Sequence, residues 1–308
     1  MVRYSGPRSY AQAIRQRYSA LAPTEVLVAV EGATDKRALM PIFRPEVKFV
    51  PAGGRDMLLG AYSELASEGL DRCLFIADCD NSFPPSLKGL QNLVITEHRD
   101  IESDALFCLR GFDRIAIEYL ASPTLELEEV ELQRDEILLT AVSFSSLLAT
   151  VKDEARQRGM VVRWPDPVTG RRTRLSFEHL PTVGTWINSQ QLPTPTDLAI
   201  EVGRALGWSP SDAHAVGRAS ESSWSAVCAP HATAECGDCR LHRHSNGHDL
   251  VSALAIDLSG RLTTSVTPAD LDRDIRMATD RTLTHTWHVG RRIRAWESSL
   301  DLSILRST

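Results

Sequence analysis

Two apolar runs that end at carboxylates constrain the fold of this chain more than any other feature. The first covers residues 26–30 and stops at Glu31, and the second covers 74–77 and is followed by Asp78 and Asp80. Each run is apolar throughout and has the length of a strand, and a helical stretch separates the two. This pattern is typical of parallel strands buried on both faces. We therefore expect an α/β fold with a mostly parallel sheet flanked by helices.

The acidic residues after these runs predict a metal site. Side chains that follow parallel strands meet at the carboxyl edge of the sheet, and Asp35 lies in the first turn of the helix after Glu31. Carboxylates this close repel one another unless a cation neutralises them, and oxygen ligands suit Mg2+, with Mn2+ as a substitute. We expect Glu31, Asp35, Asp78 and Asp80 to hold one or two such ions. Asp35 alone fits helix capping equally well.

A second acidic segment, residues 97–104, follows the predicted strand 93–96. It contains Glu97 and Glu102, either of which could complete the metal site from the same edge of the sheet. The alternative is an ordinary helix start, because acidic side chains are favoured in the first turn of a helix.

The chain divides by pattern into a leading helix within 1–23, an α/β domain over 24–118 and a mainly helical part over 119–308. The composition, 43% hydrophobic and 24% charged, is that of a globular protein. No apolar stretch approaches the roughly 20 residues that span a membrane, and no signal peptide is visible. We expect a cytoplasmic protein that does not bind membranes.

The net charge of −6 restricts how this chain could bind nucleic acid, because phosphate neutralisation normally needs a basic surface. Binding would depend on a local basic face, on metal contacts or on a partner protein. Candidate phosphate contacts are Lys36 and the arginines of the loop or hairpin 163–174, namely Arg171, Arg172 and Arg174. A solvated surface is the ordinary alternative for such residues.

A cysteine and histidine cluster lies in the loop 228–248. Cys228, His231, Cys236 and Cys239 have spacings that could bind a tetrahedral Zn2+ in a structural role. The alternative is a polar loop whose thiols stay reduced and bind no metal.

The order Val30-Glu31-Gly32, Asp35, then Ile76-Ala77-Asp78-Cys79-Asp80 resembles the Toprim fold. This Rossmann-like fold occurs in topoisomerases, bacterial primases and a class of nucleases, and the resemblance covers about 24–118. The spacing E-G-x-x-D is similar to that of nucleases of the overcoming-lysogenization-defect kind. That resemblance implies that Asp35 joins Glu31 and the D-x-D pair in binding two metal ions.

A nearer resemblance adds Asp100-Ile101-Glu102, the run 247–250 and the helical C-terminus near Trp296. Together these motifs look like the stand-alone Toprim effectors of anti-phage defence, such as those of PARIS-type systems. The resemblance implies a toxic nuclease controlled by an ABC-type ATPase, with tRNA as one substrate, and it favours Glu102 over Glu97 as the completing ligand. The chain has no Walker-type G-x-x-x-x-G-K motif, so an ATPase would have to be a separate partner.

The predicted function is therefore Mg2+-dependent hydrolysis of phosphodiesters in tRNA, other RNA or DNA, with a homodimer as a possible assembly. Asp78 and Asp80 would be primary ligands, Asp35 a ligand of the second ion, and Glu31 a ligand that also accepts a proton from the attacking water. The main alternative is a non-catalytic, metal-binding regulatory or scaffolding subunit of an ATPase. A response-regulator domain fits less well because the D-x-D follows the third strand, and a primase or topoisomerase would need further domains.

Overall fold

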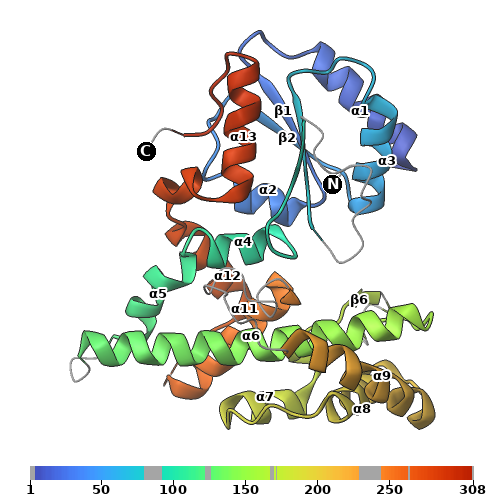
Figure 1. The fold of residues 1–308 in the computed structure, drawn as a ribbon, viewed down its shortest axis with the longest axis vertical. Coiled ribbons are helices and arrows are strands. Elements are labelled where there is room, and N and C mark those ends of the chain that lie inside the picture. The colour runs from blue at the N-terminus through green and yellow to red at the C-terminus, as the bar shows by residue number, and fades with distance from the viewer. Residues whose placement is uncertain are drawn as a thin grey trace. The chain divides into compact units, whose positions relative to one another are not determined.

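The fold was analysed in a computed structural model that describes residues 4–79, 92–121, 126–166, 170, 172–228, 244–262 and 264–306. The chain divides into two compact units. The first unit, the sheet unit, is Met1–Gly111 together with Arg276–Thr308, and the second, the helical unit, is Phe112–Ile275. Figure 1 shows the elements of both units.

The sheet unit is built on a four-stranded, all-parallel sheet with the strand order β2-β1-β3-β4. Its strands are β1 (Val26–Val30), β2 (Val47–Pro51), β3 (Cys73–Ala77) and β4 (Leu93–Ile95). Val30 pairs with Ile76, and Ile76 pairs with Val94, so β1, β3 and β4 end at nearly the same level. The predicted parallel sheet is confirmed, and acidic residues follow three of the four strands that end at its carboxyl edge.

Helices cover both faces of this sheet, and the alternation of side chains along β1 shows how. Val26, Val28 and Val30 belong to the core on one face, whereas Leu27 and Ala29 belong to the core on the other. Because successive side chains of a strand point to opposite faces, a strand that is apolar throughout must be covered twice. The covering helices are α2 (Ala33–Leu39) and α13 (His288–Ser299) on the first face, and α1 (Pro7–Ser19) and α3 (Arg55–Leu65) on the second (Figure 1).

The C-terminal segment packs on the sheet. The short helix η4 (Arg281–His285) leads into α13, and the tail then pairs with the chain between α2 and β2. Arg44 N–H donates to the carbonyl of Ile304 at 2.8 Å, and Arg306 N–H donates to the carbonyl of Ile42 at 3.0 Å. From the sequence, we grouped this segment with the helical part over 119–308. The difference arises because helical periodicity shows that a helix has an apolar face but not which surface covers it.

The helical unit contains one helix of 31 residues, α6 (Leu127–Gln157), against which other helices pack. A buried ion pair lies in its core: Lys152 Nζ donates to both carboxylate oxygens of Asp249, at 3.0 and 2.8 Å, and to the carbonyl of Leu175 at 2.7 Å. The predicted mainly helical remainder is confirmed. Its other elements, two of which cross into the sheet unit, are α5 (Gly111–Leu120), the hairpin β5 (Arg163–Pro165) and β6 (Arg172–Arg174), η2 (Phe177–His179), α7 (Pro181–Asn188), α8 (Pro195–Leu206), α9 (Pro210–Cys228), α11 (Gly247–Arg261) and α12 (Pro268–Ala278).

Across the described ranges, every helix is too short or too polar to cross a lipid bilayer.

Candidate functional site

The carboxyl edge of the sheet gathers acidic side chains from three adjacent strands and the helices that follow them. Glu31 follows β1 directly, and Asp78 follows β3 directly. After β4 the chain enters the helix α4 (Ile101–Phe107), with Asp100 as its N-cap and Glu102 in its first turn. We call this set of residues, together with Asp35, the acidic edge.

Hydrogen bonds from backbone N–H groups to carboxylates join the ends of β1 and β3 to the start of α4. Asp78 N–H donates to Glu31 Oε1 at 2.9 Å, and Ile101 N–H donates to Asp78 Oδ1 at 3.2 Å. These bonds connect the ends of β1 and β3 and the start of α4. They orient the carboxylates of Glu31 and Asp78 at the edge.

The turn after β2 also holds the end of β1. Gly53 and Gly54 donate their N–H groups to the backbone carbonyl of Glu31, at 2.8 and 3.0 Å. Their φ angles are 93° and 145°, a region that residues with a Cβ atom rarely adopt. The two glycines therefore allow the turn to approach the backbone beneath Glu31.

Asp35 caps its helix and also belongs to the acidic edge. Its Oδ2 accepts the N–H of Gly32 at 2.8 Å, and its Oδ1 accepts the hydroxyl of Thr34 at 3.2 Å. The side chain is buried, with 7% of its surface exposed. The capping interpretation is therefore correct locally, and it is compatible with a role in the edge because a carboxylate can accept further bonds on both oxygens.

Asp78 lies close enough to the other edge carboxylates to be repelled by each of them. Burial raises the pKa of Asp78 well above its usual value, and Glu31, Asp35, Asp100 and Glu102 raise it further by repulsion. Such a site favours either a proton on Asp78 or a bound cation, since both relieve the repulsion.

Asp100 is a further member of the edge, which was quoted above within the Asp-Ile-Glu motif but not predicted as a metal ligand. Its Oδ1 accepts the N–H of Ser103 at 2.9 Å and the hydroxyl of Ser103 at 2.7 Å, so it caps α4. Apart from the resemblance, an Asp three residues before a Ser at a helix start indicates capping, which is common in helices of any function. Glu97, the other candidate in this segment, is not among the largest causes of the raised pKa of Asp78.

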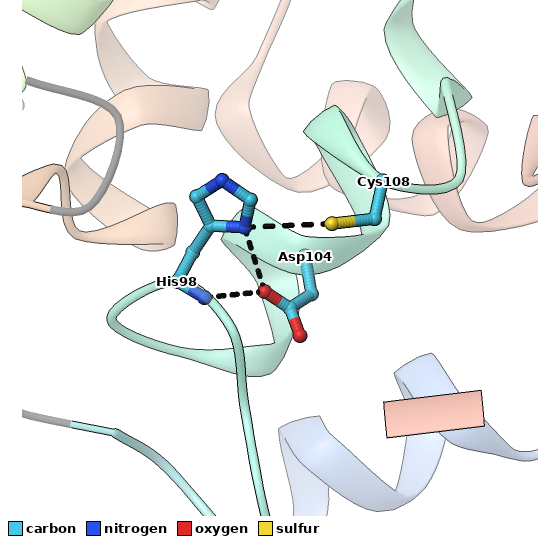
Figure 2. A group of neighbouring side chains, drawn as sticks. All are labelled: His98, Asp104 and Cys108. Carbon is cyan, nitrogen blue, oxygen red and sulfur yellow. Dashed lines mark hydrogen bonds and ion pairs between the residues drawn. The ribbon is translucent and has the colours of Figure 1, made fainter. Parts of the chain in front are cut away.

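A second cluster lies in the segment after β4, with His98 in the loop before α4, Asp104 in α4 and Cys108 at its C-cap. Figure 2 shows His98, Asp104 and Cys108 pointing toward one another. Among the described residues, only this group brings one ligand atom from each of three such side chains within 4.8 Å of one another. His98 Nδ1 lies 2.8 Å from Asp104 Oδ1 and 3.5 Å from Cys108 Sγ. Burial, followed by the charges of Asp104 and Glu97, raises the pKa of the Cys108 thiol.

The hydrogen bonds of Asp104 indicate that this cluster holds the loop in place. Oδ1 accepts from the N–H of His98 at 2.7 Å as well as from its ring, and Oδ2 accepts from the N–H of Glu97 at 3.1 Å and from Trp287 Nε1 at 2.9 Å. These four donors occupy the acceptor positions of a carboxylate, which leaves little capacity for a metal ion. We call His98, Asp104 and Trp287 the loop clasp, because they fix the segment that carries Asp100 and Glu102.

The separation of the edge carboxylates is consistent with their repulsion. Among the described residues, no three edge carboxylates bring oxygens within 4.8 Å of one another. The donor chemistry nevertheless fits Mg2+ or Mn2+, which bind carboxylate oxygens and keep several waters. The residues that would hold it are Glu31, Asp35, Asp78, Asp100 and Glu102.

The remaining predicted site residues are less well placed or lie outside the description. Lys36 is half-buried in α2, Arg172 and Arg174 are exposed in β6, and Cys228 is exposed at the end of α9. The predicted residues outside the described ranges are Asp80, Arg171, His231, Cys236 and Cys239. The zinc site and the second ligand of the D-x-D pair therefore stay predictions.

No protein-family model, curated protein or solved structure matches this chain.

Proposed function

We propose that this protein is a Mg2+-dependent nuclease that hydrolyses nucleic-acid phosphodiesters at the acidic edge. The observation that supports the proposal most strongly is the meeting of Glu31, Asp78 and the start of α4 at the carboxyl edge, where Asp78 N–H donates to Glu31 Oε1 and Ile101 N–H donates to Asp78 Oδ1. Repulsive carboxylates destabilise a fold, and binding a divalent cation is the function that such an arrangement serves best.

Each residue of the edge has a part in the proposed reaction. Asp78, with Asp80, would be a primary metal ligand, Asp35 a ligand of a second ion, and Glu102 or Asp100 a completing ligand. The Asp78 N–H orients Glu31, which we assign to metal binding and to accepting a proton from the attacking water. The metal, when bound, supplies the lowered pKa of that water and the stabilisation of the leaving oxygen.

The motif resemblance extends the proposal to a Toprim effector of anti-phage defence that is controlled by an ABC-type ATPase. Its substrate would be tRNA, another RNA or DNA. This extension depends on Glu31, Asp35 and the D-x-D pair in their sequence order, and on the Asp-Ile-Glu run at 100–102.

The proposal is tested by incubating tRNA, single-stranded RNA and plasmid DNA with the protein in Mg2+ or Mn2+. The wild type is compared with Glu31→Gln, Asp78→Asn and the control Asp71→Asn, an exposed residue just before β3. We expect cleavage by the wild type and the control but not by the other variants. Cleavage that survives either edge substitution, or that needs no divalent cation, would overturn the proposal. Metal binding without cleavage, even with an ATPase present, would instead favour a regulatory subunit.

A further inference from the structure

The hairpin β5–β6 places its arginines on one face. The strands are antiparallel, with Arg163 opposite Arg174 and Pro165 opposite Arg172. Side chains of paired residues, and of residues two apart, point to the same side of a two-stranded sheet. Arg163, Arg172 and Arg174 therefore share a face, which we call the arginine face, and all of them are exposed.

The other face of the hairpin attaches it to the helical unit. Trp164 stacks on His179 with 4.8 Å between ring centroids. His179 is held in turn by Ser176, whose N–H lies 3.1 Å and whose hydroxyl lies 2.9 Å from Nδ1. The face that carries Trp164 thus packs against η2, and the arginine face is exposed to solvent.

The charge on the arginine face is uncompensated within the described chain. None of its guanidinium groups forms an ion pair with a described acidic residue, although other exposed arginines, such as Arg8 and Arg273, do. Like charges directly opposite each other in a sheet are destabilising. Arg174 also lies close enough to Lys152 to lower the pKa of that amine, whose main cause of lowering is burial. Positive charge therefore gathers here in a chain whose net charge is −6.

We infer that the arginine face binds the phosphodiester backbone of the nucleic acid on which the protein acts. Guanidinium groups bind phosphate oxygens in a bidentate geometry, and an anion between Arg163 and Arg174 relieves their repulsion. A local basic face also allows a protein with a negative net charge to bind nucleic acid, because clustered positive charges neutralise phosphates where they meet. The inference rests on the proposed function, because that function makes a phosphodiester backbone the natural ligand.

The test measures binding in EDTA, so that metal-dependent cleavage does not interfere. Fluorescence anisotropy with a labelled single-stranded RNA and a labelled duplex DNA gives the dissociation constant at several KCl concentrations. The test variant is Arg163→Gln/Arg172→Gln/Arg174→Gln. Three phosphate contacts contribute a slope of log K against log[KCl] of about −2.1 for a single strand or about −2.7 for a duplex. We expect the variant to lose that part of the slope and to bind more weakly at every salt concentration.

The control variant Arg8→Gln/Arg204→Gln/Arg273→Gln removes the same charge from exposed arginines that pair with Glu64, Glu201 and Asp270. We expect it to bind like the wild type. Equal effects of the two variants, an unchanged slope in the test variant, or no binding by the wild type would each overturn the inference. Urea unfolding of both variants checks that they fold. Cleavage that depends on Glu31 and Asp78 while the test variant binds normally would reject the arginine face and leave the proposed function standing.

Discussion

Asp78→Asn should stabilise the metal-free protein while removing its response to Mg2+. Asparagine keeps the shape of the side chain, and its Oδ1 can still accept the N–H of Ile101. What the substitution removes is a carboxyl group that must either carry a charge beside Glu31, Asp35, Asp100 and Glu102 or keep a proton to avoid it. Most substitutions of a partly buried, hydrogen-bonded residue destabilise a protein, so a gain in stability would be diagnostic.

The sign of the effect follows from the pKa of Asp78. The pKa in the folded protein lies above that in the unfolded chain, because of burial and of repulsion by Glu31 and the other edge carboxylates. The folded state therefore retains a proton that the unfolded state releases, and stability falls as the pH rises from about 4 toward the folded-state pKa. We expect Asp78→Asn to raise the free energy of unfolding at pH 7 by more than the roughly 0.5 kcal/mol of an ordinary surface substitution.

Urea unfolding at pH 7 and pH 5, in EDTA and in excess Mg2+, measures this effect. In EDTA the advantage of Asp78→Asn over the wild type should shrink at pH 5. In Mg2+ at 100 times the dissociation constant, the wild type should gain about 2.7 kcal/mol and the variant much less. The exposed Asp71→Asn should change the free energy of unfolding by no more than about 0.5 kcal/mol. A variant less stable than wild type in EDTA, or an equal gain in Mg2+, would refute the reasoning.

Two further substitutions test the hydrogen bond between Trp287 and Asp104 and the buried ion pair between Lys152 and Asp249. Trp287→Phe removes the indole N–H that donates to Asp104, and it should lower the free energy of unfolding in urea by about 1 to 3 kcal/mol. It should also weaken Mn2+ binding, because Trp287 helps to hold the loop that carries Asp100 and Glu102. Unchanged Mn2+ affinity would contradict the role of the loop clasp. Lys152→Met should cost about 3 to 5 kcal/mol by leaving Asp249 buried without its partner, and Lys152→Met/Asp249→Leu should recover most of that loss. Burial lowers the pKa of Lys152 to about 8. Between about pH 8 and 10 the unfolded chain therefore binds a proton that the folded protein has released, so the stability of the wild type should rise with pH relative to the double variant. A stability difference that does not change with pH would contradict the burial of this amine.

The sequence predicted the sheet because its signals are local. A strand buried on both faces must be apolar throughout, and β1 and β3 are, so their ends at Glu31 and Asp78 could be read directly from the sequence. The parallel order then places both residues at one edge. The structure brings Asp35 and Glu102 to the same edge, and their role in binding metal remains a prediction.

Other features could not be predicted because they depend on contacts between distant segments. Asp104 and Trp287 are 183 residues apart, and no local pattern around either residue indicates that they meet. Asp100 was not selected because its capping pattern looks the same in a helix without any function. The arginine face needed the register of the hairpin, since Arg163 and Arg174 are far enough apart in sequence that only strand pairing shows them to be opposite.

The most direct test of the central claim is a titration with Mn2+ followed by electron paramagnetic resonance, which counts free and bound ions. We expect one or two bound ions per wild-type chain, the same number for Asp71→Asn, and loss of this binding in Glu31→Gln and Asp78→Asn. Competition by Mg2+ should release the bound Mn2+. Binding that is equal in all four proteins, or absent from the wild type, would contradict the assignment of the acidic edge as a metal centre.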